Sequence, residues 1–420
     1  MEPNPALALI LAIGLIVAAS RIGGTLARRL GQPRVLGELI IGVILGPTLI
    51  DMLHLPIFHG VELDETINEL AQLGVLLLMF IVGLEVNIRE LASVGRVGVF
   101  AGFLGALLPV VLTVPLLLLF RYSWQPALFA GVALAATSVS ISAQVLLEIG
   151  VLRTRVGSAL LATALIDDVL AILLVSLTVA ITANAGIEAG ADFGALVNIV
   201  VRMALYLIGA FLLAWFILPR VMDWLSEQPS LAQSFGIPAI ALIGLLLFAW
   251  SAEELGGVAA ITGAFIAGVG FSRSKERVRH EIEQSISSIA YVFLVPIFFV
   301  DVGLETDLSQ FPLAALPLAL LMLVVAVVSK IGGCGLGGRL GGFDNTNSIR
   351  LGVCMISRGE VGLIIASLGI GAGVFRSDDP LFASLFLVIL ASTLITPPFV
   401  RAIFRTGENR ETGRVDHRAG

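Results

Sequence analysis

Long apolar runs alternate with short polar stretches along most of this chain. A helix needs about 20 apolar residues to cross the hydrocarbon core of a bilayer, and many of the runs approach or exceed that length. The pattern predicts thirteen membrane spans, at residues 5–20, 35–50, 67–84, 97–120, 126–147, 156–181, 194–218, 235–252, 256–271, 287–304, 314–336, 349–373 and 381–402. We therefore expect an all-α polytopic membrane protein.

Composition agrees with this pattern and leaves little room for a soluble domain. Of the 420 residues, 57% are hydrophobic and 13% are charged, whereas soluble domains carry about 25% charged residues. Residues 1–404 are expected to form one membrane domain, followed by a short polar cytoplasmic tail at 405–420. Cys334 and Cys354 are the two cysteines, and both lie in or beside apolar runs. We therefore expect no disulfide framework.

The basic residues predict the orientation of the chain, because cytoplasmic loops carry an excess of Lys and Arg. If the N-terminus lies outside, 20 of the 25 basic residues fall in inner loops or in the tail. Only Arg121 and Arg376 fall outside, and Arg202, Lys330 and Arg358 lie within spans. The sequence thus predicts a multi-pass protein of the cell membrane, with its N-terminus outside and its C-terminus in the cytoplasm.

An internal repeat relates the two halves of the chain. Residues 79–87 (MFIVGLEVN) match residues 299–307 (FVDVGLETD) at an offset of 220, and a pair of glycines five residues apart recurs in the preceding spans. The matched spans are seven apart, an odd number, so the halves run in opposite directions. We expect two inverted six-helix repeats, at about 5–181 and 235–402, joined by a linker helix at 194–218. Such repeats place their substrate site near the membrane midplane.

Two adjacent carboxylates interrupt the apolar run VGSALLATALIDDVLAILLVSLTVAI at 156–181. Asp167 and Asp168 follow Arg155 by 12 and 13 residues, which at ~1.5 Å per residue puts them near mid-membrane. A charge there costs at least ~2.5 kcal/mol and usually marks an ion or proton path. Neighbouring helical residues point about 100° apart. One aspartate can therefore meet a buried partner while the other faces a cavity.

Two other spans have unusually polar centres. Residues 136–144 include Thr137, Ser138 and Gln144, and residues 357–362 read SRGEVG. Both predict interrupted helices, because unwound backbone survives at membrane depth only beside a cavity or buried in protein. Its carbonyls and half-helix ends would supply partial charges to an ion. Packing between helices explains the hydroxyls of span 126–147 about equally well.

Charged residues in the second half supply possible partners for the aspartates. Lys330 is the only lysine within a span, so we expect it to pair with an Asp, the alternative being that it snorkels toward a helix end. Arg358 and Glu360 could satisfy one another, or Glu360 could line the cavity. Asp301 lies near the outer end of its span and is expected to be a hydrated funnel residue.

Two further motifs are set aside as sites. Residues 333–338 match GxGxxG, but no strand precedes them and no acidic residue follows at the required distance. Close helix packing explains these glycines. His54 and His59 lie in an outer loop with acids nearby. Without further ligands, they are interpreted as solvated loop residues.

Together, these motifs resemble one known family. The segments ATSVSISAQVLLEIGVL, ALIDDVLAILLV, PIFFVDVGLETDL and SRGEVGLIIASLG, with the intramembrane Lys330, look like the sodium/proton exchanger domain of the monovalent cation:proton antiporter-2 family. The resemblance covers residues 37–399. It implies a dimerisation domain, hence a homodimer, and a six-helix core with two crossing discontinuous helices that moves like an elevator.

The resemblance also implies roles for individual residues. It implies that Asp167 and Asp168 hold a monovalent cation or proton, with Asp168 the main carrier and Asp167 paired with Lys330. Thr137, Ser138 and Glu360 would help to form the site, and Arg358, Asp301 and Gln144 are accessory candidates. Asp301 departs from the small or apolar residue expected at its position.

The expected activity is exchange of Na⁺ for H⁺, with Li⁺ or K⁺ left open as the cation. The Asp-Asp pair and the lack of a cytoplasmic nucleotide-binding domain in this chain resemble the electrogenic sodium/proton branch. No cofactor, enzyme activity or nucleic-acid partner is expected, because the proton gradient supplies the energy. Alternatives are a K⁺/H⁺ antiporter or K⁺ efflux carrier of the same family, a cation channel, and a membrane-embedded aspartic hydrolase.

Overall fold

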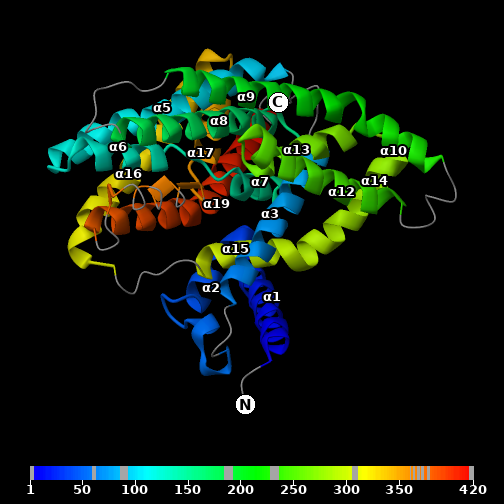
Figure 1. Cartoon of the computed structure of the whole chain (residues 1–420), viewed down its shortest axis with the longest axis horizontal. Coiled ribbons are helices and arrows are strands. Elements are labelled where there is room, and N and C mark those ends of the chain that lie inside the picture. Colours follow the sequence, from blue (N-terminus) through cyan, green and yellow to red (C-terminus); the bar gives the residue numbers. More distant parts are fainter. Residues whose placement is uncertain are drawn as a thin grey trace. The chain divides into compact units, whose positions relative to one another are not determined.

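The computed structural model describes residues 4–58, 63–85, 93–183, 193–227, 236–304, 311–359, 361–362, 365–366, 369, 373–375 and 379–415. These residues form helices and connecting turns, with no β-strand among them. The α-helices are α1 (Pro5–Arg29), α2 (Arg34–Leu45), α3 (Asp64–Glu85), α5 (Gly95–Leu119), α6 (Trp124–Ala133), α7 (Val139–Glu148), α8 (Arg155–Ala183), α9 (Phe193–Phe216), α10 (Leu218–Ser226), α12 (Gly236–Ser251), α13 (Ala260–Phe271), α14 (Glu276–Ile289), α15 (Val295–Leu304), α16 (Leu316–Leu340), α17 (Asn345–Cys354) and α19 (Pro380–Val415) (Figure 1).

Within the described residues, nine helical stretches are long and apolar enough to cross a membrane, and α7 and α13 are shorter apolar helices. The predicted all-helical, polytopic character is therefore confirmed. Two predicted boundaries were clearly wrong: the helix expected to end at residue 20 continues to Arg29, and the helix expected to begin at residue 287 begins at Glu276. The segment added at Glu276 is amphipathic, and it buries Val278, Ile282 and Ile286 at a spacing of four residues. Hydropathy alone could not predict it, since its other face is polar.

The chain divides into two compact units. Unit 1 comprises Met1–Gly23, Glu38–Arg89 and Ile172–Gln310, and unit 2 comprises Gly24–Gly37, Glu90–Ala171 and Phe311–Gly420. In unit 1, α3 packs against α13 and α15. The backbones approach closely there, since a Cβ on Gly83 would lie 3.0 Å from the Cα of Gly268.

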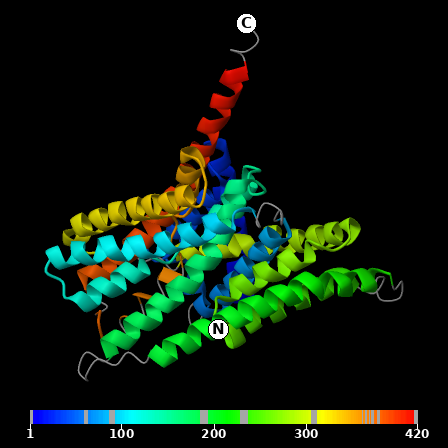
Figure 2. The same ribbon diagram turned by 90° about the horizontal axis from the view of Figure 1, so that it is seen from above.

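In unit 2, α16 packs against α5, α17 and α19, and α5 also packs against α6. The C-terminal part of α19 extends away from these helices (Figure 2). Glycines permit the close approach of α16 and α5, because a Cβ on Gly333 would lie 2.5 Å from the carbonyl oxygen of Leu104. The glycine motif at 333–338 therefore serves helix packing. Cys334 and Cys354 are both buried and free.

Candidate functional site

Two membrane segments of unit 2 are interrupted helices. α6 ends at Ala133 and α7 begins at Val139, so residues 134–138 are not helical. α17 ends at Cys354, and residues 355–359 are likewise not helical. Both interruptions predicted from the polar centres are present, although the first is shorter than the polar run, since residues 139–144 lie within α7.

Hydrogen bonds to backbone carbonyls join the two interruptions. The amide of Ser138 donates to the carbonyl of Ser357 at 3.0 Å, and Ser357 Oγ donates to the carbonyl of Ser138 at 2.6 Å. Ser142 Oγ donates to the carbonyl of Cys354 at 2.5 Å. A Cβ on Gly359 would lie 2.7 Å from Ser138 Cβ. Part of the unwound backbone is thus satisfied by protein, as membrane depth requires.

Arg358 supplies a buried positive charge beside the end of α17. Its side chain is fully buried, and it donates to the carbonyls of Met355 at 3.2 Å, Ile356 at 2.5 Å and Ala326 of α16 at 3.0 Å. The last carbonyls of a helix lack intrahelical partners and carry partial negative charge. A guanidinium there satisfies and neutralises them. Thr393 of α19 in turn donates to the carbonyl of Arg358.

Asp167 and Lys330 form a buried ion pair in unit 2. Lys330 Nζ of α16 donates to Asp167 Oδ1 of α8 at 2.9 Å, and the two side chains are 0% and 1% exposed. Lys330 therefore does not snorkel, and the pair expected from the sequence is formed. The second carboxylate oxygen, Asp167 Oδ2, is buried and has no hydrogen-bond partner among the residues that the structure describes.

Helix α5 packs against both helices that carry this pair. A Cβ on Gly102 would lie 2.7 Å from Ile166 of α8, and one on Gly105 would lie 3.8 Å from Lys330 Nζ of α16. Small residues allow such close approach between membrane helices. The glycines of α5 thus let α8 and α16 lie near enough for a short ion pair.

The remaining candidate residues of unit 2 are Asp168, Thr137, Gln144 and Glu360. Asp168 is half-buried and engaged in an interaction. Thr137 and Gln144 are buried, and their Oγ1 and Oε1 atoms have no hydrogen-bond partner within the described part of the chain. Gln144 Nε2 approaches Glu148 Oε1 at 3.5 Å. Glu360 lies outside the described residues.

Asp301 and His54 differ in how well the sequence predicted their surroundings. Asp301 belongs to unit 1 and is only 6% exposed, with Asn68 donating to its Oδ2 at 3.4 Å. The expected hydrated funnel position was therefore wrong, because α3 covers the carboxylate. His54 lies in an exposed turn and contacts Asp51 Oδ1 at 2.7 Å. The described residues contain no group of three or more ligands that could hold a metal, and His59 lies outside them.

Sequence reasoning missed two hydroxyls beside the site residues. Thr163 lies four residues before Asp167 on α8, hence on the same face, and its buried Oγ1 has no partner among the described residues. The helical spacing could have identified it. Thr393, which donates to the carbonyl of Arg358, follows no pattern that singles it out.

This arrangement suits a small hard cation or a proton. Its parts supply carboxylate, hydroxyl and main-chain oxygens, which are the ligands that hard cations prefer. Arg358 connects them, because it donates to the carbonyl of Ala326 on α16, the helix that carries Lys330. Buried positive charges from Lys330 and Arg358 stand beside them. Such a centre offsets the cost of charge within the membrane while leaving oxygen atoms for an ion.

Comparisons with known proteins agree with this chemistry. The profile of the family described as sodium/hydrogen exchanger, transmembrane, matches residues 15–406. The Na(+)/H(+)-K(+) antiporter GerN of Bacillus cereus is 35% identical over 392 residues, which cover 93% of this chain and 95% of that protein. A Na(+)/H(+) antiporter of Enterococcus hirae is 33% identical over 388 residues, covering 91% and 94%. The solved sodium proton antiporter MjNhaP1 of Methanocaldococcus jannaschii shares the fold, with a TM-score of 0.64, 17% identity and coverage of 95% and 98%.

Proposed function

Because this chain belongs to the sodium/hydrogen exchanger family, we propose that it is a secondary antiporter that exchanges Na⁺ for H⁺ across the cell membrane. The observation that carries the proposal is the buried Asp167–Lys330 pair, with Asp168 next to it on α8. Intramembrane acids of this kind mark ion and proton paths. No cofactor is needed, since the ion gradients supply the energy.

Exchange follows from competition for one carboxylate. Lys330 neutralises Asp167, which is 1% exposed, whereas Asp168 is half-buried. Asp168 is thus the acid that an ion can reach, and it binds either a proton or a cation. Thr137, Ser138 and Glu360 belong to the proposed site as oxygen donors. The buried, unpartnered Thr137 Oγ1 supports this role among the described residues.

The proposed architecture has thirteen spans in two inverted repeats, with unit 2 as the moving core and unit 1 as the scaffold of a homodimer. A reciprocal glycine contact in unit 1 supports the repeats. Gly83 of α3 approaches Gly268 of α13, and Gly303 of α15 approaches Gly42 of α2. Because Gly83 and Gly303 are the 220-residue equivalents, each repeat makes the same contact with the other. Inverted repeats that exchange such contacts are suited to alternating access.

Transport by the purified full chain in proteoliposomes tests the proposed function. With a proton gradient across the membrane, added Na⁺ should cause proton movement whose rate saturates as the Na⁺ concentration rises. Choline in place of Na⁺ should cause none. Li⁺ and K⁺ in separate arms decide the cation, and K⁺ is a second candidate because the relative GerN is named as a Na(+)/H(+)-K(+) antiporter. A membrane-potential dye reports whether exchange is electrogenic. Cation movement that is independent of protons and does not saturate would instead indicate a channel.

The proposed orientation is tested by labelling single cysteines. Cysteine at Glu65, in the predicted outer loop, should react with an impermeant thiol reagent from outside, and cysteine at Glu276 only from inside. Both positions are exposed, and the native Cys334 and Cys354 are buried, so the background should be low. Labelling of both positions from one side would contradict the topology.

A further inference from the structure

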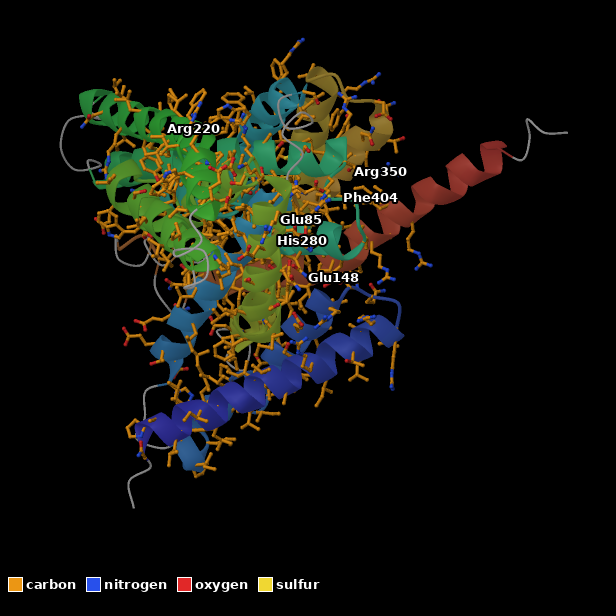
Figure 3. All side chains as sticks on the ribbon, turned by 90° about the vertical axis from the view of Figure 1, so that its right-hand side faces the viewer. Glu85, Glu148, Arg220, His280, Arg350 and Phe404 are labelled. Carbon is orange, nitrogen blue, oxygen red and sulfur yellow. The ribbon has the colours of Figure 1, made fainter. Side chains whose placement is uncertain are left out.

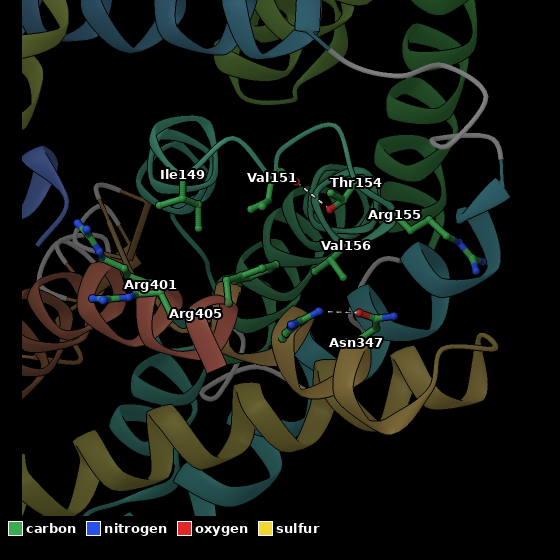
Figure 4. A pocket seen from close by; sticks show the side chains of 10 residues that line it. Ile149, Val151, Thr154, Arg155, Val156, Asn347, Arg401 and Arg405 are labelled. Atoms are coloured by element: carbon green, nitrogen blue, oxygen red, sulfur yellow. Dashed lines mark hydrogen bonds between the residues drawn. The ribbon is translucent and has the colours of Figure 1, made fainter. Parts of the chain in front are cut away.

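A cavity of about 580 Å³ opens in unit 2, at the end that we assign to the cytoplasm. Its walls come from the turn after α7, the start of α8, α17 and α19 (Figure 4). Four of its ten lining residues are arginines, Arg155, Arg350, Arg401 and Arg405, and none of these described lining residues is acidic. Small-molecule sites occupy roughly 300–1,000 Å³. The cavity therefore has room for an organic ligand.

Three of the four arginines of this cavity lack a carboxylate partner within the described part of the chain. No described carboxylate forms an ion pair with Arg350, Arg401 or Arg405. Arg350 lies 5.0 Å from the ring of Phe404 (Figure 3). It also approaches Asn347 Oδ1 at 3.5 Å (Figure 4). Its Nε is buried and has no hydrogen-bond partner among the described residues. A buried donor of this kind is costly unless it is satisfied.

The N-terminus of α8 adds to the positive potential. α8 begins at Arg155 and has no acidic residue in its first turn, whereas Asp344 is the N-cap of α17. A helix N-terminus carries roughly half a positive charge and favours an anion.

The cavity wall is fixed by local structure. Gly150, with a φ of +73°, follows the end of α7, and the amide of Val151 donates to the carbonyl of Leu146 at 2.9 Å. Thr154 Oγ1 donates to the carbonyl of Val151 at 2.7 Å (Figure 4). Such helix-terminating turns are well-defined structures. The wall formed by this turn is thus ordered without a ligand.

Charged and apolar surfaces alternate around the cavity. In Figure 4, Arg401 and Arg405 lie on one side and Arg155 lies on the opposite side. The apolar lining residues include Val151 and Val156. A bare inorganic ion would leave this apolar surface uncovered, whereas an anion attached to an apolar body would contact both kinds of surface.

We propose that this cavity binds an organic phosphate. Arginine favours phosphate because its planar guanidinium donates two parallel hydrogen bonds to the oxygens. The phosphate can belong to an anionic lipid headgroup or to a soluble phosphate compound, since both present the same chemistry to the arginines. The bound ligand joins α17 and the turn after α7 to α8, which carries Asp167 and Asp168; α7 and α17 reach the interrupted segments at their opposite ends. Occupancy of the cavity therefore changes the exchange rate.

Binding is measured on the purified full chain in an uncharged detergent, independently of transport. Thermal unfolding is followed with short-chain phosphatidylglycerol, phosphatidylcholine of the same chain length, ATP and inorganic phosphate, all as choline salts at constant ionic strength. A ligand that binds only the folded state raises the melting temperature with its concentration. We expect phosphatidylglycerol, ATP or both to raise it, and phosphatidylcholine to have no effect.

Variants test whether the arginines of the cavity are responsible. Arg350→Gln should weaken the apparent affinity by about tenfold or more, as expected for loss of a charge-assisted bidentate contact. Arg350→Lys should restore only part of it, because the ammonium lacks the planar fork. The double variant Arg401→Gln/Arg405→Gln should also weaken binding. If Arg350→Gln does not fold, this double variant shows whether the arginines of the cavity bind the phosphate. The matched control is Arg28→Gln/Arg29→Gln, two exposed arginines at the end of α1 that do not line the cavity.

The arms of the experiment also identify the source of the phosphate. A response to phosphatidylglycerol alone assigns a lipid headgroup, and a response to ATP alone assigns a soluble compound; both support the site. No response in any arm would overturn the proposal. An equal loss of affinity in the Arg28/Arg29 control would also overturn it, because binding would then reflect general surface charge.

Discussion

The two ion pairs Lys330–Asp167 and Lys275–Glu227 join the same chemical groups in two different settings. The nitrogen–oxygen distance is 2.9 Å in the first, within unit 2, and 2.6 Å in the second, within unit 1. The side chains are 0% and 1% exposed in the first pair, but 53% and 65% exposed in the second. Surface pairs contribute little because water and salt screen them. Loss of one partner should therefore destabilise the protein more at the pair in unit 2, because that pair is buried and not because it is shorter.

The largest predicted effect is loss of one partner of the buried pair. Lys330→Gln leaves Asp167 as an uncompensated buried charge, which typically costs about 3–5 kcal/mol. We expect a large fall in the melting temperature in detergent, and less current per cation exchanged if Lys330 takes part in charge transfer. Asp167→Asn/Lys330→Gln should regain part of the lost stability, since neither charge is then orphaned.

The exposed pair is the control for this prediction. Lys275→Gln should leave the melting temperature nearly unchanged, because water solvates Glu227 when its partner is removed. Additive losses in the Asp167/Lys330 double variant would show that the buried residues do not interact. A fall after Lys275→Gln as large as that after Lys330→Gln would contradict the difference between the two settings.

The second effect concerns Arg358, whose buried guanidinium donates to three carbonyls. Arg358→Met removes hydrogen bonds that involve a charged group, each worth about 1.5–3 kcal/mol. Two of the three bonds share one nitrogen, and removal of a buried charge also removes its desolvation cost. We therefore expect a net loss of stability of about 2–3 kcal/mol in chemical unfolding. Arg358→Lys should not restore it, because an ammonium cannot reach carbonyls on both α16 and the end of α17. Full rescue by lysine would show that only the charge matters.

A smaller effect is expected where α16 packs against α5. Gly333→Ala would place a methyl group 2.5 Å from the carbonyl oxygen of Leu104, and overpacking of this kind costs about 1–3 kcal/mol. Gly14→Ala in α1 is the control, because nothing lies within 4 Å of its Cβ position. The melting temperature should fall only for Gly333→Ala. Equal behaviour of the two variants would mean that α5 and α16 do not pack as closely as described.

The smallest effect is a pH dependence at His54. Its hydrogen bond to Asp51 raises its pKa above the usual 6.5, and the charges of Asp51 and Asp64 act in the same direction. A raised folded-state pKa stabilises the fold below about pH 6.5, and this stabilisation is lost as the pH rises through the higher folded value. His54→Gln should thus lower the melting temperature slightly at pH 6 and not at pH 9. A loss of equal size at both pH values would show that protonation is not involved.

The sequence predicted those features that follow from the cost of burial. Apolar runs indicated the helices, and the polar centres indicated both interruptions, because unwound backbone needs a buried or hydrated setting. Lys330 and Asp167 were predicted to pair because each is a charge isolated within an apolar span. Each of these features could be predicted because a short stretch of sequence would be too costly to bury in any other arrangement.

Features that depend on main-chain partners or on the packing of distant helices were not predictable. Arg358 donates to carbonyls, which carry no signal in the sequence, although Glu360 had been considered as its partner. Asp301 was expected to be hydrated, but α3 covers it. The arginine cavity draws its residues from four separate segments. No local pattern could bring them together.

If Asp168 binds either a proton or a cation, binding of the cation must release the proton into solution. Purified protein in weakly buffered detergent solution is mixed with Na⁺ while the pH is recorded, with choline as the control. We expect Na⁺ to displace protons from the native chain and none from Asp168→Asn, with Asp168→Glu retaining a weaker response. If a folded Asp168→Asn protein released as many protons as the native chain, Asp168 would not be the carboxylate for which Na⁺ and H⁺ compete.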